Sequence, residues 1–187
     1  MHIYLVRHAA TDTRNATDPY NHPLSAAGQG RARELAALCQ EWGIELLVVG
    51  MMQHSLETAD AISALLPHVE RWDLADLEEM ALDDLLGDPT ASHLVSTWTP
   101  EQFQTGLERL WIRVMPVVTR ILIYAEAHRL QNVAIVAGEQ VLKLMLLNWL
   151  DQDWTGFTQQ ELALAPGSVT CVTIDDDGAR IDYLNQV

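Results

Sequence analysis

The sequence predicts an α/β protein, and we expect a three-layer α/β/α sandwich around a mostly parallel sheet. Runs of strand-forming apolar residues alternate along the chain with segments of helical periodicity, which is the pattern of α/β folds. The length of 187 residues and the hydrophobic content of 49% suit one domain with a substantial core. No repeat or linker divides the chain, so a single domain over residues 1–187 is expected.

The predicted strands are short apolar runs. The first, Ile3–Val6, has no polar interruption, which is typical of a parallel strand buried on both faces. The last two runs are separated by Asp175–Gly178, which has the chemistry of a hairpin turn. We therefore expect strands at residues 3–6, 44–49, 69–72, 133–137, 169–174 and 179–184.

The predicted helices are recognised by their start and stop residues. Ser25 is a suitable N-cap for the first helix, and Gly43 ends it. Pro67 stops the second helix, and Pro116 is expected to kink the third. The polar, turn-rich stretch 13–23 is expected to be a loop. Helices are therefore expected at residues 26–42, 55–66, 101–128 and 140–150.

The chain is strongly acidic, with a formal net charge of −15. Nucleic acids and anionic membranes need a basic surface, so neither is expected as a partner. No apolar run is long enough to span a bilayer, and polar residues interrupt the only early apolar stretch, which disfavours a signal peptide. Cys39 and Cys171 are far apart in the sequence and indicate reduced thiols in a cytoplasmic protein.

Residue spacing predicts no cofactor and no metal site. The histidines outside the motifs described below lack the spacing of metal ligands, so each is interpreted as a surface or core residue. These are His2, His22, His68, His93 and His128. Asp175–Asp177 could bind a cation, but a turn is the favoured interpretation. Large apolar side chains at 111–118 and 145–149 suggest a homodimer interface without establishing one.

Arg7 and His8 directly follow the first strand. Ligands of open α/β sheets bind at the carboxyl ends of strands, so these side chains are placed where a ligand would lie. The arginine fork matches phosphate, and a neutral imidazole can attack phosphorus. The alternative is a strand that simply ends in two solvated polar residues; the position at a strand end, with Thr11 following, favours a functional role.

Several motifs resemble those of the histidine phosphatase superfamily, the phosphoglycerate mutase-like group, over nearly the whole chain. Leu5-Val-Arg-His-Ala-Ala-Thr11 is similar to the Arg-His-Gly signature. Pro23-Leu-Ser-Ala-Ala-Gly28 is similar to the Leu-Ser-x-x-Gly that opens the first helix, and Gln53-His-Ser-Leu-Glu-Thr-Ala59 to the segment x-Arg-Ala-x-x-Thr-Ala. Further matches are Leu77-Glu-Glu79, Val133–Leu142 and Ala165-Pro-Gly-Ser168. Their order and spacing together imply a phosphoglycerate mutase-like fold.

The resemblance implies a role for each matching residue. His8 would be the nucleophile that carries the phosphoryl group, and Glu79 the general acid. Arg7 and Thr11 would contact the phosphate. A small phosphorylated molecule would be the ligand, with no cofactor and no metal ion.

The departures from the family pattern fall on the phosphate pocket. The second phosphate arginine is replaced by His54, and the second pocket histidine by Gly138 with Glu139 beside it. The usual asparagine of the signature is Arg14. Removing one preorganised donor typically lowers the rate by about 10²–10³.

Partial compensation is conceivable at two of these positions, 54 and 14. His54 could replace some of the lost charge if a carboxylate keeps it protonated, which would make anion binding depend on pH between 5 and 8. Arg14 could swing into the pocket, although loop arginines are usually solvated. Glu139 would weaken phosphate binding if it points inward and would be neutral if it points outward.

Two classes of function stay open from the sequence. One is a phosphomonoesterase that uses His8, either fully active or crippled by the changes at 54 and 138. The other is a non-catalytic descendant with an interaction or regulatory role. The lost donors favour weak or absent phosphatase activity, and hence a pseudoenzyme, over an efficient enzyme.

Overall fold

The computed structural model describes residues 1–14, 20–159 and 162–187. Its centre is a six-stranded sheet with the strand order β3-β2-β4-β1-β5-β6. The first four strands in this order are parallel to one another, whereas β5 is antiparallel to β1 and β6 is antiparallel to β5. The expectation of a mostly parallel sheet is confirmed.

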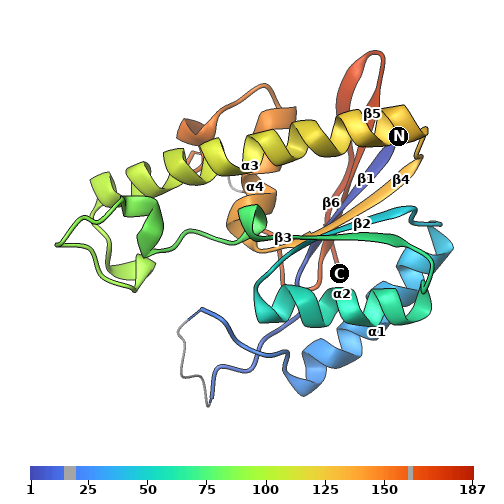
Figure 1. Ribbon diagram of the computed structural model, residues 1–187, viewed down its shortest axis with the longest axis horizontal. Coiled ribbons are helices and arrows are strands. Elements are labelled where there is room, and N and C mark those ends of the chain that lie inside the picture. The colour runs from blue at the N-terminus through green and yellow to red at the C-terminus, as the bar shows by residue number, and fades with distance from the viewer. Residues whose placement is uncertain (15–19, 160–161) are drawn as a thin grey trace.

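The strands lie close to the predicted apolar runs. β1 and β4, the two central strands, are buried over most of their length, as an apolar run without polar interruption requires. The bounds are β1 His2–Arg7, β2 Leu46–Gly50, β3 Glu70–Leu74, β4 Asn132–Ala137, β5 Val169–Asp175 and β6 Gly178–Gln186. β5 and β6 form the expected hairpin, which extends beyond the other strands at the top of Figure 1.

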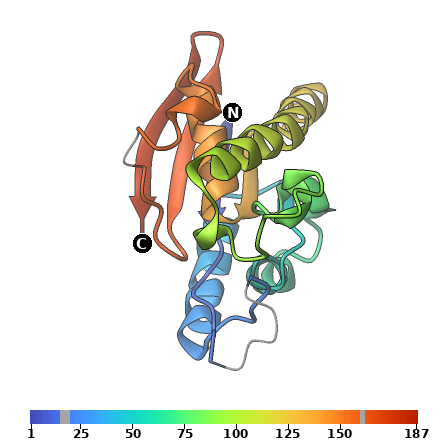
Figure 2. The ribbon, with the colours of Figure 1, turned by 90° about the vertical axis from the view of Figure 1, so that its left-hand side faces the viewer.

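Helices cover both faces of the sheet and complete the three layers (Figures 1 and 2). The helices α1 (Ala26–Glu41) and α2 (Gln53–Leu65) pack against one face, and α3 (Pro100–His128) and α4 (Glu139–Trp149) against the other. Each face of the sheet thus has its own hydrophobic cluster. Within the described residues, no helix combines the length and the apolar character that crossing a membrane requires.

The start of α1 lies against the chain segment that follows β1. Ser25 caps the helix by accepting a hydrogen bond from the backbone N–H of Gly28 at 3.0 Å, as predicted. The Ser25 hydroxyl donates to the carbonyl of Ala10 at 3.1 Å. A Cβ on Gly28 would lie 2.0 Å from that same carbonyl oxygen, which explains the glycine of this motif. Gly43 follows the helix with a φ of +62°.

The third helix runs from Pro100 to His128 as one element that contains Pro116. The loop expected at 13–23 is irregular where it is described, and its residues 15–19 lie outside the described residues. The connection 75–99 contains short 3₁₀ turns and lies beside the first turns of α3, at the left of Figure 1.

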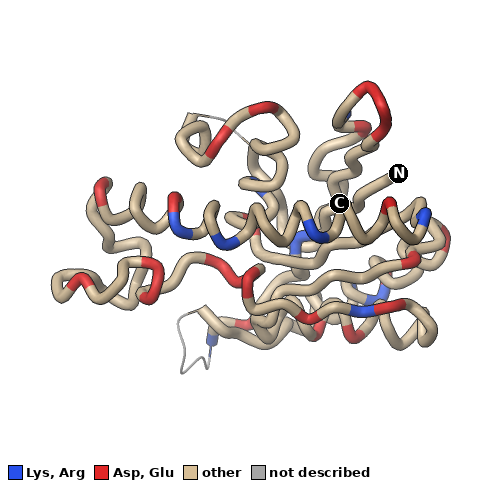
Figure 3. Tube along the Cα trace, turned by 45° about the horizontal axis from the view of Figure 1, so that its top comes forward, with Lys and Arg blue, Asp and Glu red and all other residues tan. Residues whose placement is uncertain are grey.

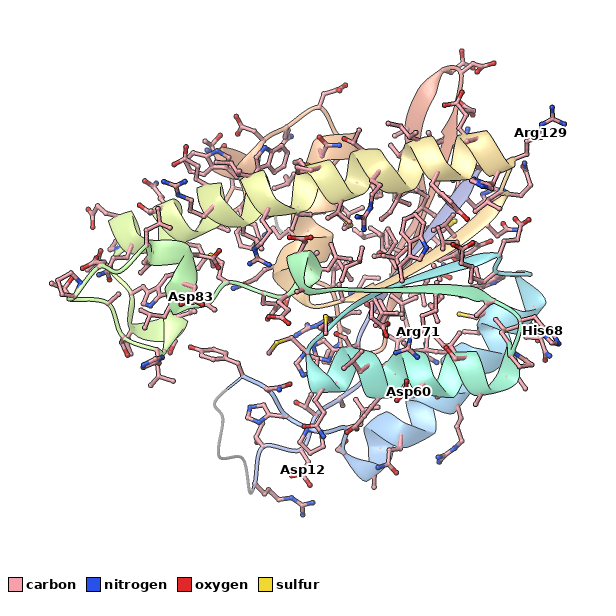
Figure 4. The ribbon with its side chains drawn as sticks, viewed as in Figure 1. Asp12, Asp60, His68, Arg71, Asp83 and Arg129 are labelled. Carbon is pink, nitrogen blue, oxygen red and sulfur yellow. The ribbon has the colours of Figure 1, made fainter. Side chains whose placement is uncertain are left out.

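Acidic residues outnumber basic ones in the sequence, 26 to 11, and Figure 3 shows them distributed along most of the chain. Arg71 on β3 illustrates how the few arginines are used, because it bonds Asp60 on α2 and Asp73 on its own strand, both at 2.7 Å. Figure 4 shows Arg71 and Asp60 facing each other between the strand and the helix. This arginine is engaged in holding the edge of the sheet.

Candidate active site

Arg7 and His8 lie at the carboxyl end of β1, beside the end of β4. The backbone N–H of His8 donates to the carbonyl of Ala137 at 3.1 Å, and that of Arg7 donates to the carbonyl of Ser168 at 3.0 Å. His8 is 8% exposed. Its position is therefore set by three strands at once, as expected for a side chain at the edge of a parallel sheet.

The imidazole of His8 has a defined tautomer. Its Nδ1 lies 2.9 Å from the carbonyl oxygen of Ala9, and because a carbonyl only accepts, Nδ1 carries the hydrogen. Burial, followed by the neighbouring His54, lowers the pKa of His8 to about 3. At neutral pH the ring is therefore uncharged, and the lone pair of its Nε2 is free of a proton.

His54, in the first turn of α2, lies against His8. The ring centroids are 3.8 Å apart, and His54 is 5% exposed. Burial lowers the pKa of His54 to about 4, and the carboxylate of Glu57 only partly offsets that effect. The idea that a carboxylate keeps His54 protonated near neutral pH is therefore wrong, and His54 adds no positive charge to the pocket at pH 7.

Glu79 reaches the same edge of the sheet from the connection after β3. Its Oε1 accepts a hydrogen bond from the backbone N–H of Gln140 at 3.0 Å, and the side chain of Gln140 accepts one from the N–H of Met80 at 2.9 Å. Burial raises the pKa of Glu79 above its ordinary value. A carboxyl group that holds its proton is what a general acid needs.

Glu79 also fills the space beside Gly138. A Cβ at Gly138, which caps the start of α4, would lie 2.3 Å from Oε1 of Glu79. A histidine at 138 would therefore require the carboxylate to move. The present position of Glu79 thus depends on the absence of a side chain at position 138.

Glu139 points inward. Its Oε2 lies 2.9 Å from Nη1 of Arg7, and the same Nη1 donates a hydrogen bond to the carbonyl of Leu164. Of the two orientations open from the sequence, the structure has the inward one, in which the carboxylate is paired with Arg7. Sequence reasoning missed Leu164, because a backbone acceptor 157 residues away leaves no mark in the residue pattern.

The loop residues Thr11 and Arg14 make other contacts. Thr11 pairs with Leu24 in an isolated antiparallel bridge. The guanidinium of Arg14 bonds Asp12, with Nη2 and Oδ2 2.6 Å apart, and its side chain is 82% exposed. In this structure the guanidinium of Arg14 is therefore paired with Asp12. Arg14 does not supply the positive charge that an arginine at position 54 would bring.

An open cavity of about 560 Å³ lies next to Gln140. Its lining is largely apolar and comes from Tyr20, Val95, Ser96, Trp98, Pro100, Phe103 and Gln140. Among these side chains, Trp98 is 9% exposed. Only the fold brings these residues beside the amino end of α4.

Comparison with known proteins agrees with this geometry. The model of the histidine phosphatase superfamily (branch 1) matches residues 3–187, so the chain belongs to this family. No curated protein matches the sequence significantly.

Solved structures with a similar fold include phosphatases of low sequence identity to this chain. The alpha-ribazole phosphatase from Shigella flexneri is 20% identical, with 100% of this chain and 96% of that chain covered and a TM-score of 0.75. A mycobacterial glucosyl-3-phosphoglycerate phosphatase, solved with VO3, is 17% identical, with coverages of 100% and 99% and a TM-score of 0.76. A mutant phosphoserine phosphatase from Entamoeba histolytica, in complex with phosphoserine, is 12% identical, with coverages of 98% and 96% and a TM-score of 0.67.

Proposed function

We propose that this protein binds small phosphorylated molecules weakly and has weak or lost phosphatase activity. The observation that carries the proposal is the ion pair between Arg7 and Glu139, whose Nη1 and Oε2 lie 2.9 Å apart. The guanidinium that would contact a phosphate is thus already paired with a carboxylate of the protein.

The charges around the pocket support this proposal. A phosphoryl group brings two negative charges, and its transition state spreads them over more oxygens. Of the three basic side chains Arg7, His8 and His54, Arg7 alone carries a positive charge at pH 7. The lowered pKa values of His8 and His54 leave both rings neutral at that pH. The amino end of α4 would attract an anion, but its Gln140 N–H is bonded to the carboxyl group of Glu79.

The two side chains that would take part in bond breaking and bond formation, His8 and Glu79, are present. Their presence favours some remaining phosphatase activity. The Nε2 lone pair of His8 can attack phosphorus while Glu79 gives its proton to the departing alkoxide. Water then attacks the phosphohistidine, and Glu79 can take up the proton of that water, which releases inorganic phosphate and restores His8. Arg7 Nε is buried with no hydrogen-bond partner among the described residues, so one donor of the guanidinium is not used within the described part of the protein.

Two alternatives follow from the same site. A fully active phosphomonoesterase is favoured by the neutral His8 and by the pKa of Glu79, which burial raises. A non-catalytic interaction or regulatory protein is favoured by the paired Arg7. The relatives whose names include glucosyl-3-phosphoglycerate and phosphoserine support a small phosphorylated ligand, whose organic part would lie in the apolar cavity beside Gln140.

The amino-acid sequence supports two further proposals, one about the cellular location of the protein and one about its partners. We place it in the cytoplasm, where reduced Cys39 and Cys171 would persist. We also keep a homodimer, and the absence of nucleic-acid and membrane partners, as expectations of the sequence.

The test is a phosphatase assay on p-nitrophenyl phosphate and a panel of sugar phosphates, with His8→Ala as the control. We expect slow or undetectable turnover in the wild type. Turnover at the level of the alpha-ribazole phosphatase, abolished by His8→Ala, would contradict the proposal. Binding of vanadate should be weak, lost in Arg7→Ala and unchanged in Arg71→Ala, whose side chain serves the sheet edge.

A further inference from the structure

A second group of side chains, of the types that ligate metal ions, lies at the opposite end of β1. One ligand atom each of His2, Cys171 and Asp182 lies within 4.8 Å of the other two. Six residues separate His2 from His8, which at about 3.3 Å per residue places the two groups roughly 20 Å apart along the strand. This cluster is therefore independent of the candidate active site.

Three neighbouring strands bring the cluster together. His2 on β1 pairs with Thr173 on β5, and Cys171 lies two residues before Thr173 on the same face. Asp182 comes from β6, on the other side of β5. The residues are separated by 169 and 11 positions in the sequence, so no spacing motif could indicate them.

A β-bulge directs Asp182 into the cluster. On β5, Cys171 and Val172 are consecutive, whereas their partners on β6 are Tyr183 and Ile181. Asp182 is the extra residue between those partners. Bulges of this kind re-aim a side chain and are frequent beside functional sites. The carboxylate oxygen Oδ2 of Asp182 lies 3.7 Å from Sγ of Cys171 and 3.8 Å from Nδ1 of His2.

These separations are close to those of a coordination sphere. Zn²⁺ binds sulfur at about 2.3 Å and nitrogen or oxygen at about 2.0–2.2 Å in a tetrahedron, which places neighbouring ligand atoms about 3.3–3.7 Å apart. Small side-chain rotations would therefore bring all three atoms onto one ion. Thiolate, imidazole and carboxylate are also the ligand types that zinc uses in proteins.

We propose that His2, Cys171 and Asp182 form a binding site for a divalent transition-metal ion of the zinc type. Three protein ligands leave a fourth position for water. The ion would enter from solvent past His2 and Asp182, whose side chains are 47% and 27% exposed, and reach the buried sulfur of Cys171.

Neighbouring side chains already orient the ligands. Nε of Arg180 bonds Oδ1 of Asp182 at 3.1 Å and leaves Oδ2 for the cluster. Thr173 Oγ1 contacts Nδ1 of His2 at 2.9 Å and donates to Oδ2 of Asp182. A bound ion would take the place of this hydroxyl as the partner of both groups, and the thiol of Cys171 would release its proton to solvent on coordination.

The test is titration of the untagged protein with Co²⁺, a spectroscopic substitute for Zn²⁺, followed by competition with Zn²⁺. We expect one Co²⁺ per chain with a thiolate-to-cobalt charge-transfer band in the near ultraviolet, and displacement by Zn²⁺. Cys171→Ser should abolish the band, and His2→Gln should weaken binding at least tenfold. The buried Cys39 is the matched control, and Cys39→Ser should leave the band intact.

Three results would overturn the proposal: no Co²⁺ bound by the wild type, binding without the thiolate band, or a band that survives in Cys171→Ser. His2 lies at the exposed start of β1, so His2→Gln keeps the test decisive even if Cys171→Ser fails to fold. Because the readout is metal binding, its outcome is separate from that of the phosphatase assay.

Discussion

The candidate site has two sides, here called the β1 wall and the α4 wall after the elements that carry them, and they differ in the groups that they present. The β1 wall keeps Arg7 and a neutral His8 with Nε2 free of a proton, which is the arrangement a phosphorus nucleophile needs. The α4 wall presents Gly138 without a side chain, and beside it the carboxyl groups of Glu79 and Glu139. A nucleophile depends on a few local contacts, whereas phosphate binding depends on the summed charge of the whole pocket, so the second can be lost while the first persists.

The largest effect is expected from restoring the α4 wall and position 54 together. His54→Arg combined with Gly138→His returns two donors around an intact His8. At about 10²–10³ per donor, phosphatase activity on p-nitrophenyl phosphate should rise by roughly 10⁴, with each single variant gaining much less because the donors act on one transition state. Gly138→His should gain least, since its Cβ would lie 2.3 Å from Oε1 of Glu79.

The background Glu139→Gly and the control His8→Ala complete that experiment. Removing Glu139 frees Arg7 and should increase the gain of the double variant, whereas His8→Ala should abolish it. Wild-type activity equal to that of the double variant would show that the pocket works as it stands, and the contrast between its walls would then have no catalytic meaning.

A smaller effect is expected from releasing Arg7 alone. Glu139→Gln removes the carboxylate that lies 2.9 Å from Nη1 of Arg7. A hydrogen bond to a charged group is worth about 1.5–3 kcal/mol, so vanadate should bind roughly 10- to 100-fold more tightly, as isothermal titration can measure. Glu34→Gln, which breaks an exposed pair with Arg31, is the matched control and should change nothing. Unchanged vanadate binding in Glu139→Gln would refute the role given to this ion pair.

A change of pH between 5 and 8 is expected to have the smallest effect on anion binding. His54 has a pKa of about 4, so it stays neutral between pH 5 and 8 and cannot recruit an anion there. Binding of sulfate, whose own charge is constant in this range, should vary little. A steep rise in affinity as the pH falls from 8 to 6, lost in His54→Gln, would show that His54 becomes charged near neutrality.

The same group gives a prediction for stability. The folded pKa of His54 lies below its unfolded value of 6.5, so the unfolded chain takes up the proton first and stability falls as the pH drops from 6.5 towards 4. The full contribution is at most about 3 kcal/mol. Urea unfolding at pH 7 and pH 4.5 should show a smaller difference for His54→Gln than for the wild type. The exposed His68 is the control, and His68→Gln should behave like the wild type (Figure 4).

Much of the fold could be predicted because local signals agree with the global arrangement. The apolar run at Ile3–Val6, the cap at Ser25 and the turn at Asp175–Gly178 each specify an element from adjacent residues. The start of α2 differs by two residues, because Gln53 and His54 have no side-chain cap to mark it. Helix boundaries without a capping residue are the least determined part of such a pattern.

The position of the candidate site could be predicted from the sequence, but the charges of its side chains could be predicted less well. Strand ends placed Arg7, His8 and Gly138 at one edge, as the backbone bond from His8 to Ala137 now shows. The inward turn of Glu139, the neutral state of His54 and the fit of Glu79 against Gly138 depend on packing between distant segments. The cluster of His2, Cys171 and Asp182 is the extreme case, since a bulge and three strands create it.

The ion pair between Arg7 and Glu139 implies two states of the site, one in which the pair is closed and one in which it is open. Each molecule has its guanidinium closed onto Glu139 or open to a ligand, and only the open fraction binds. If about one molecule in ten is open, the apparent dissociation constant is about tenfold larger than the intrinsic one. The carboxylate is tethered to the same chain, so its effective concentration at Arg7 does not change when the protein is diluted. Under the proposed function, Glu139 would therefore act as an intramolecular competitor of the ligand, and only an anion at high concentration, or one with contacts outside the pocket, would displace it.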